Sequence, residues 1–377
     1  IAKAAEIITE VVIDKAAEIV TEVAVDKAAE ILEEVVVEKA AAVMEELPTQ
    51  KLNDTIPEMN ETALTERLPG MSAEKLYDVK PAVLFDSLPN APTEQLVGEV
   101  APVVLEGLDQ PEVLRVTSDG EEYLAIKTVE DEWVVVMATP APLEQLMIKT
   151  KRALENVKTI VGVFEKQPAE IAVSLPAEQT VRAYVAVSFE NAAPEDIEIG
   201  HMNFYVEKDW LKQNSIHKWS VVLNRYDSAL KQWVPLPTKR VKEDDSRMYY
   251  SVTITQFSIF AISGSESLPP RNFEASNFNL DLASIKGGEP VTISADITNL
   301  SDKAGIFVAT LWIDNTIETG KNISLKGKET TALSFTVTRN IEGSFEVRLD
   351  RLFGSFSVTE AAPAPEEKVL VTPSRWW

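Results

Sequence analysis

The first 48 residues repeat one twelve-residue phrase four times, and this repeat constrains the fold more than any other feature. The phrase reads IAKAAEIITEVV and returns as IDKAAEIVTEVA, VDKAAEILEEVV and VEKAAAVMEELP. Its Ala, Glu, Ile, Leu and Lys content without glycine predicts helix. Taking every fourth residue gives one apolar row and one acidic row, which is not the strict alternation of a half-buried strand.

The apolar row cannot stay on one face of a continuous helix. A step of four residues turns about 400°, so the row drifts by about 120° over each phrase, whereas a heptad coiled coil keeps its stripe on one seam. One solution is a single helix of about 70 Å, buried by different neighbours along its length. The other is a stack of short helices, each beginning at an Asp cap, Asp14 or Asp26. We favour the continuous helix; a solvated linker helix is the remaining alternative.

In either packed form the apolar faces need partners, and the acidic row repels itself within one helix. We therefore predict that residues 1–48 associate with copies of the chain or dock on another protein. Because the chain begins at Ile1 and not at Met, we expect a processed chain or a fragment, and further copies of the phrase can precede it. The candidate self-assembly face consists of Ile8, Val12, Val20, Leu32, Val36 and Met44.

Residues 49–110 carry a second repeat of about twenty residues, with two prolines at matching places in each unit. Since proline is tolerated in the first turn of a helix, each unit is predicted to be a pair of short helices, the second beginning at Pro57, Pro81 or Pro102. Stacked pairs bury a continuous core, and such arrays are spacers and binding surfaces more often than enzymes. The predicted core positions are Leu52, Leu76, Leu96, Leu64, Leu84 and Leu105.

Residues 111–164 are predicted to form a small β-meander followed by a helix. The β-branched runs from 112 to 137 are broken at Asp119 and Gly120, a strong hairpin signal. The stretch 143–164 has a helical apolar period. That period is carried by Leu143, Leu146, Met147, Leu154, Val157 and Val161.

Residues 165–264 contain β-branched and aromatic runs separated by turn residues, which predicts an all-β domain. The stretches IGHMNFYVEKDWLKQNSIHKWSVVLNRYDSALKQWVPLPT and YYSVTITQFSIFAISG resemble the PGF-pre-PGF domain of archaeal and some bacterial surface proteins. The resemblance implies a β-sandwich on the cell exterior without catalytic residues. We expect Trp210, Trp219 and Trp233 in or near its core, with an aromatic ligand groove as the alternative, and a solvated turn at 239–247.

Residues 271–360 follow a Ser/Pro linker and show about seven alternating strands, which fits an immunoglobulin-like β-sandwich. The segments GGEPVTISADITN, LWIDN and GSFEVRL resemble the cell-adhesion-related domain of bacteria and archaea (CARDB). Residues 361–377 read as a Pro/Ala stalk and a juxtamembrane tail. Arg375, Trp376 and Trp377 are typical of a membrane interface, so we expect an anchor beyond them; a disordered tail is the alternative.

Charge and composition exclude several functions. The net charge of −24 argues against a nucleic-acid partner. With no cysteine and only His201 and His217, the chain cannot form zinc–thiolate or multi-histidine sites. Cofactor motifs are absent, and we identify no ligand set for Ca²⁺, although the acidic clusters suit it. Both histidines are expected to be structural. Exterior chains carry glycans at sequons, here Asn53, Asn60, Asn299 and Asn322.

The expected fold class is multidomain α + β: a helical repeat array, a β-meander with a helix, and two β-sandwiches. The expected function is that of a non-enzymatic structural cell-surface protein. It would be extracellular, an S-layer or membrane-anchored stalk subunit that assembles through its N-terminal repeats. The alternative is an adhesin, or a scaffold or accessory subunit of an extracellular complex; a hydrolase is a distant third.

Overall fold

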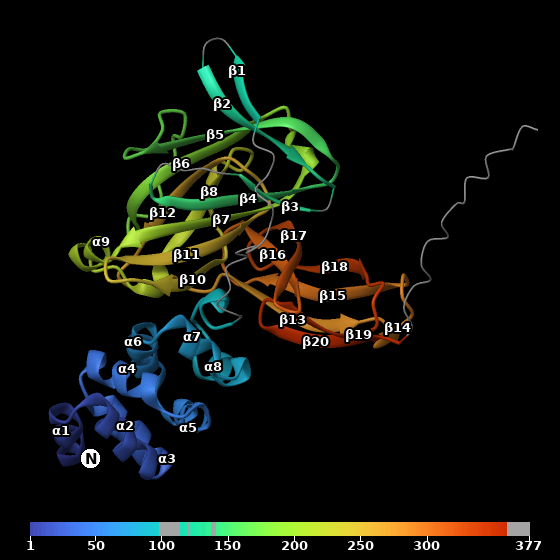
Figure 1. Cartoon of the computed structure of the whole chain (residues 1–377). Coiled ribbons are helices and arrows are strands. Elements are labelled where there is room, and N and C mark those ends of the chain that lie inside the picture. Colours follow the sequence, from blue (N-terminus) through green and yellow to red (C-terminus); the bar gives the residue numbers. More distant parts are fainter. Residues whose placement is uncertain (98–113, 119–120, 131, 137–140, 360–377) are drawn as a thin grey trace, which may run out of the picture.

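The computed structural model describes residues 1–97, 114–118, 121–130, 132–136 and 141–359. N-terminal helices are followed by mostly antiparallel sheets, a multidomain α + β arrangement. Figure 1 shows the helices at one end of the molecule, a larger β unit above them, and a smaller β unit beside both. Some predicted positions fall outside the described ranges: Pro102, Leu105, Asp119, Gly120, Arg375, Trp376 and Trp377.

The first 48 residues form four short helices, so the favoured continuous helix is wrong. They are α1 (Ala2–Glu10), α2 (Ile13–Glu22), α3 (Val25–Glu34) and α4 (Val37–Glu46). Asp14 and Asp26 lie in the first turns of their helices, not at the N-caps, which are Val12 and Ala24. Each helix ends at the tenth residue of its phrase, and the eleventh residue, its C-cap, is extended. These residues are Val11, Val23, Val35 and Leu47.

Breaking the helix once per phrase removes the drift of the apolar row, because each short helix can turn the same face to one core. The breaks fall where valines cluster, and β-branched residues are weaker helix formers than the Ala, Glu and Lys that precede them. Helix α1 packs on α3 and α2 packs on α4, so the array has layers two helices apart. The fourth, fifth and eighth residues of the phrase fill the core: Ala16, Ala17, Val20, Ala28, Ala29, Leu32, Ala40, Ala41 and Met44.

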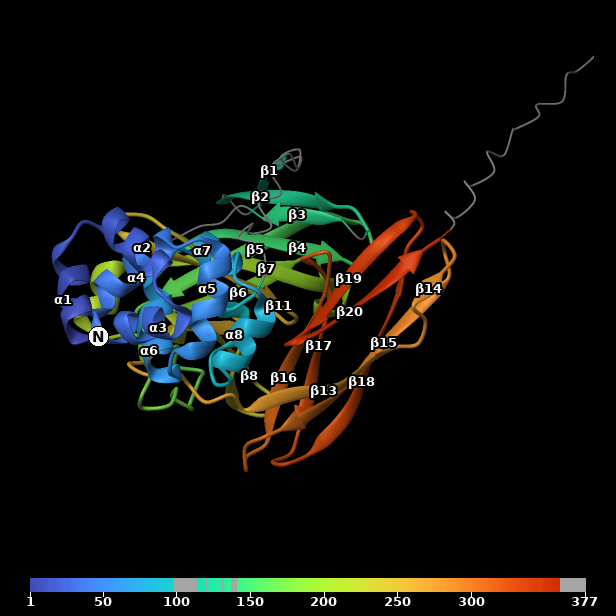
Figure 2. The same cartoon turned by 90° about the horizontal axis from the view of Figure 1, so that it is seen from below.

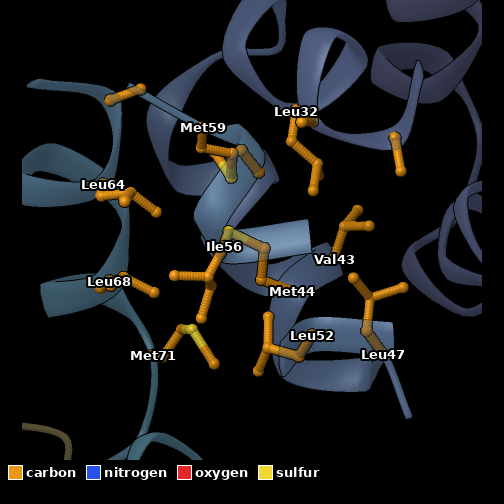
Figure 3. Packing of buried hydrophobic residues seen from close by; sticks show 14 of the residues in the cluster. Leu32, Val43, Met44, Leu47, Leu52, Ile56, Met59, Leu64, Leu68 and Met71 are labelled. Atoms are coloured by element: carbon orange, nitrogen blue, oxygen red, sulfur yellow. The ribbon is translucent and has the colours of Figure 1, made fainter. Parts of the chain in front are cut away.

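The array continues through shorter helices. They are α5 (Thr49–Thr55), η1 (Ile56–Glu58), α6 (Glu61–Arg67), η2 (Leu68–Gly70), α7 (Ala73–Tyr77), α8 (Pro81–Ser87) and η3 (Thr93–Gln95). Pro81 opens α8 as predicted, and Pro57 lies within η1. Side chains from successive helices, among them Leu32, Met44 and Leu64, converge on one core in Figure 3. The leucines predicted as core within residues 1–97 are buried: Leu52, Leu64, Leu76, Leu84 and Leu96. We call residues 1–97 the helical array.

The first β unit spans residues 114–264, and its described residues form twelve strands. They are β1 (Leu114–Ser118), β2 (Glu121–Thr128), β3 (Trp133–Val136), β4 (Leu143–Thr150), β5 (Leu154–Phe164), β6 (Thr180–Glu190), β7 (Ile197–Glu207), β8 (Val222–Asp227), β9 (Gln232–Pro235), β10 (Thr238–Glu243), β11 (Arg247–Ile254) and β12 (Ile259–Gly264). One sheet has the order β1-β2-β5-β6-β12-β8-β9 and the other β10-β11-β7-β4-β3. Buried side chains from both sheets form one core. Short helices lie between strands at η4 (Pro194–Asp196), α9 (Lys208–Gln213) and η5 (Lys218–Ser220).

The helix predicted within 143–164 is wrong, because this stretch forms β4 and β5. The helix-like spacing arises at β-bulges, where one extra residue puts side chains three apart on the same face. The β4–β7 register shifts between Leu143 and Gln145. The β2–β5 register shifts between Leu154 and Val157, and Asn156 between them has φ 55°.

The second β unit spans residues 273–358 and contains eight strands. They are β13 (Phe273–Leu280), β14 (Ser284–Ile285), β15 (Pro290–Asn299), β16 (Gly305–Ile313), β17 (Thr316–Leu325), β18 (Thr330–Thr338), β19 (Gly343–Leu349) and β20 (Leu352–Val358). The sheet orders are β13-β15-β18 and β14-β20-β19-β16-β17. Burial alternates along β15 and β18, as the sequence pattern predicts. Asp314 and Asn315 both have positive φ, which a two-residue type I′ turn between β16 and β17 requires.

Candidate functional site

Positively charged side chains from elsewhere in the chain bind the carbonyl groups at the C-terminal ends of the array helices. The last carbonyl groups of a helix have no partner within it, and Lys or Arg can bond them and complement the helix dipole. Three lysines each reach a carbonyl oxygen 28 residues earlier, at the C-cap of the α-helix three before their own. These bonds are Lys39 to Val11, Lys51 to Val23 and Lys75 to Leu47.

An arginine completes the set at the one place where the lysine period is interrupted. Ala63 occupies the position where the next lysine of the period would lie. Arg67 on the same helix binds the carbonyl groups at a helix end in its place. The buried guanidinium of Arg67 donates to the Leu32 carbonyl at 2.9 Å, to Glu33 at 2.6 Å and to Val35 at 3.2 Å. All four C-caps of α1–α4 are therefore met by cations.

The first β unit supplies the next cation, Arg240 on β10. Arg240 is 2% exposed, and its guanidinium donates to the carbonyls of Pro69 at 2.8 Å and Met71 at 2.6 Å, where η2 ends. The Tyr77 hydroxyl donates back to the Arg240 carbonyl at 2.7 Å, and the Gln95 amide donates to Thr238 at 2.8 Å. The solvated turn predicted for 239–247 is therefore wrong for its first residues, because Arg240 is buried and binds the carbonyl groups at the end of η2.

The second β unit closes the last helix in the same way. Arg351, between β19 and β20, donates to the carbonyls of Phe85, Leu88 and Ala91 at the end of α8. Burial, aided by nearby Arg271, lowers the pKa of Arg351 to about 10, so it stays charged at neutral pH. We call the six residues with this role the cap cations: Lys39, Lys51, Arg67, Lys75, Arg240 and Arg351.

The three units meet around a cavity of about 560 Å³. Its walls come from η3 of the array, from β8 and β9, from the linker 269–272, and from β16 with the loop before it. We call this space the junction cleft. Its apolar walls are prolines and aromatic rings: Pro92, Pro176, Pro235, Pro237, Pro269, Pro270, Trp219, Trp233, Phe273 and Phe307.

Charges along the junction cleft are mostly paired within the chain. Glu94 lies 3.3 Å from the Arg348 guanidinium. Asp350 lies 3.0 Å from Arg271 and also accepts a hydrogen bond from Thr93 at 2.7 Å. By contrast, two buried polar atoms of lining residues have no hydrogen-bond partner among the described residues. They are the Trp219 indole nitrogen and the Thr310 hydroxyl oxygen.

Both histidines are engaged in structural contacts. The His217 Nδ1 accepts from the Trp219 backbone N–H at 3.1 Å, so its Nε2 carries the proton and donates to the Thr65 carbonyl of the array at 3.1 Å. Burial lowers the pKa of His217. His201 on β7 contacts the Ser251 hydroxyl, which donates to the Asn203 side-chain oxygen at 2.7 Å. Because that serine proton is committed to Asn203, His201 donates to Ser251 and does not act as its base.

We expect His201 to make the protein less stable in acid. Burial, with the nearby Lys239 charge, lowers the pKa of His201 to about 4, against 6.5 in the unfolded chain. The stability that the neutral His201 contributes is fully present above pH 6.5. It is lost as the pH falls from 6.5 to 4, because over this range the unfolded chain binds a proton that the folded chain does not. The loss is about 3 kcal/mol. Urea unfolding of wild type and His201→Gln between pH 7 and 4 should show a flatter pH dependence for the variant; parallel curves would contradict this.

The six residues of the predicted self-assembly face do not form one surface. Four of them lie in the core of the array at 0% exposure, because each short helix turns its eighth residue inward. These four are Ile8, Val20, Leu32 and Met44. Val12 and Val36, at the N-caps of α2 and α4, are exposed.

The four sequons differ in accessibility. Asn53 is buried and its side-chain nitrogen donates to Thr49, while Asn299 is fully buried and donates to Lys303 and Lys326. A bulky glycan on either nitrogen would break these bonds in the folded chain. Asn60 is exposed and Asn322 is half-buried, so glycosylation there stays a prediction.

Among the described residues, no group of three or more His, Asp or Glu side chains is placed to hold a metal ion. Over the same ranges, no helix is both long and apolar enough to cross a membrane. The sequence had given no role to the cap cations or the junction cleft. The lysine period of twelve was a usable signal for the first cap cations, but the cleft is assembled from distant segments and has no local signal.

One protein family matches part of the chain: the family model of the MgtE intracellular N domain matches residues 1–88. This match covers the helical array and not the β units. No curated protein matches the chain. Nothing in these comparisons bears on the resemblances of residues 165–264 and 271–360 to surface-protein domains, which stay expectations.

Solved structures give only weak likenesses. A β-glucosidase from Listeria innocua is 15% identical over 26% of this chain and 18% of its own, with a TM-score of 0.22. A β-glucuronidase from Bacteroides uniformis is 13% identical over 53% of this chain and 32% of its own, at 0.17. The N-terminal domain of a Streptococcus gordonii adhesin is 9% identical over 72% of this chain and 98% of its own, at 0.12. At these TM-scores none of them bears on fold or function.

Proposed function

We propose that the protein is a non-enzymatic structural component of a cell surface, an S-layer or membrane-anchored stalk subunit that associates with its own copies. We also propose that both β units are β-sandwiches, the second immunoglobulin-like. The extracellular location rests on the resemblances of residues 165–264 and 271–360; the word intracellular in the matched family describes MgtE. Antibody labelling of intact cells against the second β unit tests the location, and labelling only after lysis would refute it.

The proposal is carried by a difference in exposure between the seventh residues of the four phrases. Ile7 is 47% exposed and Ile19 is half-buried, but Ile31 is 3% and Val43 0% exposed. The position is apolar in every phrase, but it is buried only in α3 and α4, which have array helices packed on two sides. Helix α1 packs on α3, and within the described residues no other layer covers its outer side. A second copy of α1 would supply that cover.

The place of α1 in the molecule favours such a contact. Figures 1 and 2 both show α1 at the outer edge of the array, on the side opposite the second β unit, so a second molecule can reach its outer side. A symmetric contact between two α1 helices would be isologous, the commonest arrangement in soluble homo-oligomers. The acidic row of the array stays on the outside, where ions in solution can screen it.

We expect Ile7→Glu to weaken self-association at least tenfold, about 1.4 kcal/mol. The substitution puts a charge into an apolar contact while leaving the core untouched, since Ile7 is exposed. Sedimentation velocity over a range of concentrations measures the effect. Val36→Glu is the matched control, because Val36 is also exposed and apolar but lies at the N-cap of a later helix. A wild-type chain that stays monomeric, or equal weakening by both variants, would reject the proposal.

The junction cleft favours a second candidate function, that of an adhesin or an accessory subunit of an extracellular complex. A cavity of about 560 Å³ lies within the range of small-ligand sites, and such sites prefer interfaces between domains. The structural function does not require this cleft. What co-purifies with the chain separates the two: copies of itself support the first, and a glycan or a different polypeptide supports the second.

A further inference from the structure

We propose that two copies of the chain pair through antiparallel α1 helices, with Lys3 of each copy bound at the C-terminal end of the other copy's α1. The inference rests on the proposed self-association. It adds the relative direction of the two helices and the charged side chains that select this direction.

The third residue of the repeated phrase is a lysine that binds a helix end inside the array. Lys39 donates to the Val11 carbonyl, and Lys51, which continues the period, donates to the Val23 carbonyl. Lys3 has the same place in the first phrase and is exposed, but its side chain binds no carbonyl group among the described residues. The structure therefore shows what a lysine at this position binds, and Lys3 has yet to bind it.

Lys3 also differs from the lysines of the next two phrases. Lys15 pairs with Glu18 of its own helix at 2.5 Å, and Lys27 pairs with Glu30 at 3.0 Å. Within the described part of the chain, Lys3 forms no such ion pair. Its ammonium group is therefore available to a second molecule.

The outer side of α1 carries an apolar line with opposite charges at its two ends. Ala4, Ile7 and the C-cap residue Val11 follow at spacings of three and four residues, which are typical of a seam between paired helices. Ile7 is exposed and the other two are half-buried. Lys3 and Glu10 are both exposed, and because they lie two helical turns apart they flank this line on the same side.

Charge complementarity selects the antiparallel direction. With a two-fold axis at Ile7, Lys3 of one copy lies opposite Glu10 of the other, and the same pair forms again across the axis. The ammonium group would also lie beside the last carbonyl groups of the second α1, at the negative end of its dipole. A parallel pair would place Lys3 against Lys3 and Glu10 against Glu10, and like charges at such contacts repel.

The direction can be tested by cross-linking, because the chain contains no cysteine. Full-length Lys3→Cys and Glu10→Cys chains, carrying tags of different mass, are mixed under mild oxidation. We expect a disulfide between the two kinds of chain and little within either kind, because only the antiparallel pair brings positions 3 and 10 together. This mixed pair also keeps one contact between Lys3 and Glu10. Lys212→Cys, at an exposed lysine on α9, is the control and should cross-link with neither.

The charges can be tested by reversing them. In sedimentation velocity at low salt, Lys3→Glu should weaken self-association about fivefold, since two contacts of opposite charge become two of like charge. Glu10→Lys should do the same, and the chain with both substitutions should recover most of the affinity. The effects should shrink at about 0.5 M salt, where exposed charges are screened. Lys212→Glu changes the net charge as Lys3→Glu does and should leave the affinity unchanged.

The outcomes separate this inference from the self-association on which it rests. If Ile7→Glu weakens association but Lys3→Glu and Glu10→Lys do not, the copies associate and the antiparallel charge pairs are rejected. Cross-links within each cysteine variant, in place of those between them, would reject the antiparallel direction as well. So would losses in both single variants that the combined substitutions do not recover. A wild-type chain that stays monomeric rejects both proposals.

Discussion

Replacing Arg240 by alanine is expected to lower the free energy of unfolding by about 3 to 5 kcal/mol. Arg240 is 2% exposed, and its guanidinium donates to the carbonyls of Pro69 and Met71, so its loss leaves two buried acceptors at the end of η2 without partners. Strand β10 also accepts hydrogen bonds from Tyr77 and Gln95 of the array, so the array should also loosen from the first β unit. Urea unfolding measures the first effect. Hydrogen exchange of the amides from 68 to 79 measures the second.

The control for Arg240 is Arg152. Arg152 also donates two hydrogen bonds, to Asp196 at 2.7 and 2.9 Å, but its side chain is 62% exposed. Exposed ion pairs contribute about 0 to 1 kcal/mol, so Arg152→Ala should change little. Arg240→Lys should fall between wild type and Arg240→Ala, because an ammonium keeps the charge but not the planar fork. Similar small losses for the two alanine variants would show that the array is closed by other contacts.

The extent to which this fold follows from the sequence differs between its parts. Alternating burial along β15 and β18, and the turn at Asp314 and Asn315, follow from local pattern and turn chemistry, and both are present. The helical nature of residues 1–48 was also predicted correctly. The breaks at Val11 and Val23 were not, because valine only weakly disfavours helix and the gain comes from packing between layers.

The error in β4 and β5 has a different cause. A β-bulge adds one residue to one strand, so it turns the two-residue period of a strand into an apparent helical period. The sequence of 143–164 contains two such places, at Leu143–Gln145 and at Leu154–Val157. Pairing partners on β7 and β2 create these bulges, and a single stretch of sequence does not reveal them.

The junction was beyond prediction because its partners are distant in sequence. The stretch 239–247 looks solvated from its charges alone, and only the ends of η2 make a buried site for Arg240. Arg351 meets the end of α8 in the same way. The lysine period, by contrast, was visible in the phrase, but a period alone does not say which helix each lysine closes. Long-range capping becomes evident only when helices three apart in the sequence are seen in contact.

Leu32→Ala and Val36→Ala should differ sharply, although the two residues lie four apart in the same apolar row of the sequence. Leu32 is 0% exposed in the core shown in Figure 3, so its truncation should cost about 2 to 5 kcal/mol, from lost burial and the cavity left behind. Val36 is 58% exposed at the N-cap of α4, and its truncation should stay within about 0.5 kcal/mol.

This pair of variants separates the two forms that residues 1–48 could take. On a continuous helix the row would wind past successive neighbours, and truncating either of two adjacent members of the row should then lower the free energy of unfolding. In the layered array the difference follows from the break at Val35, which turns Leu32 inward and Val36 outward. Urea unfolding of both variants at one protein concentration, below that of self-association, gives the comparison. Losses of similar size would mean that both side chains are covered, and the layered packing of α3 and α4 would have to be abandoned.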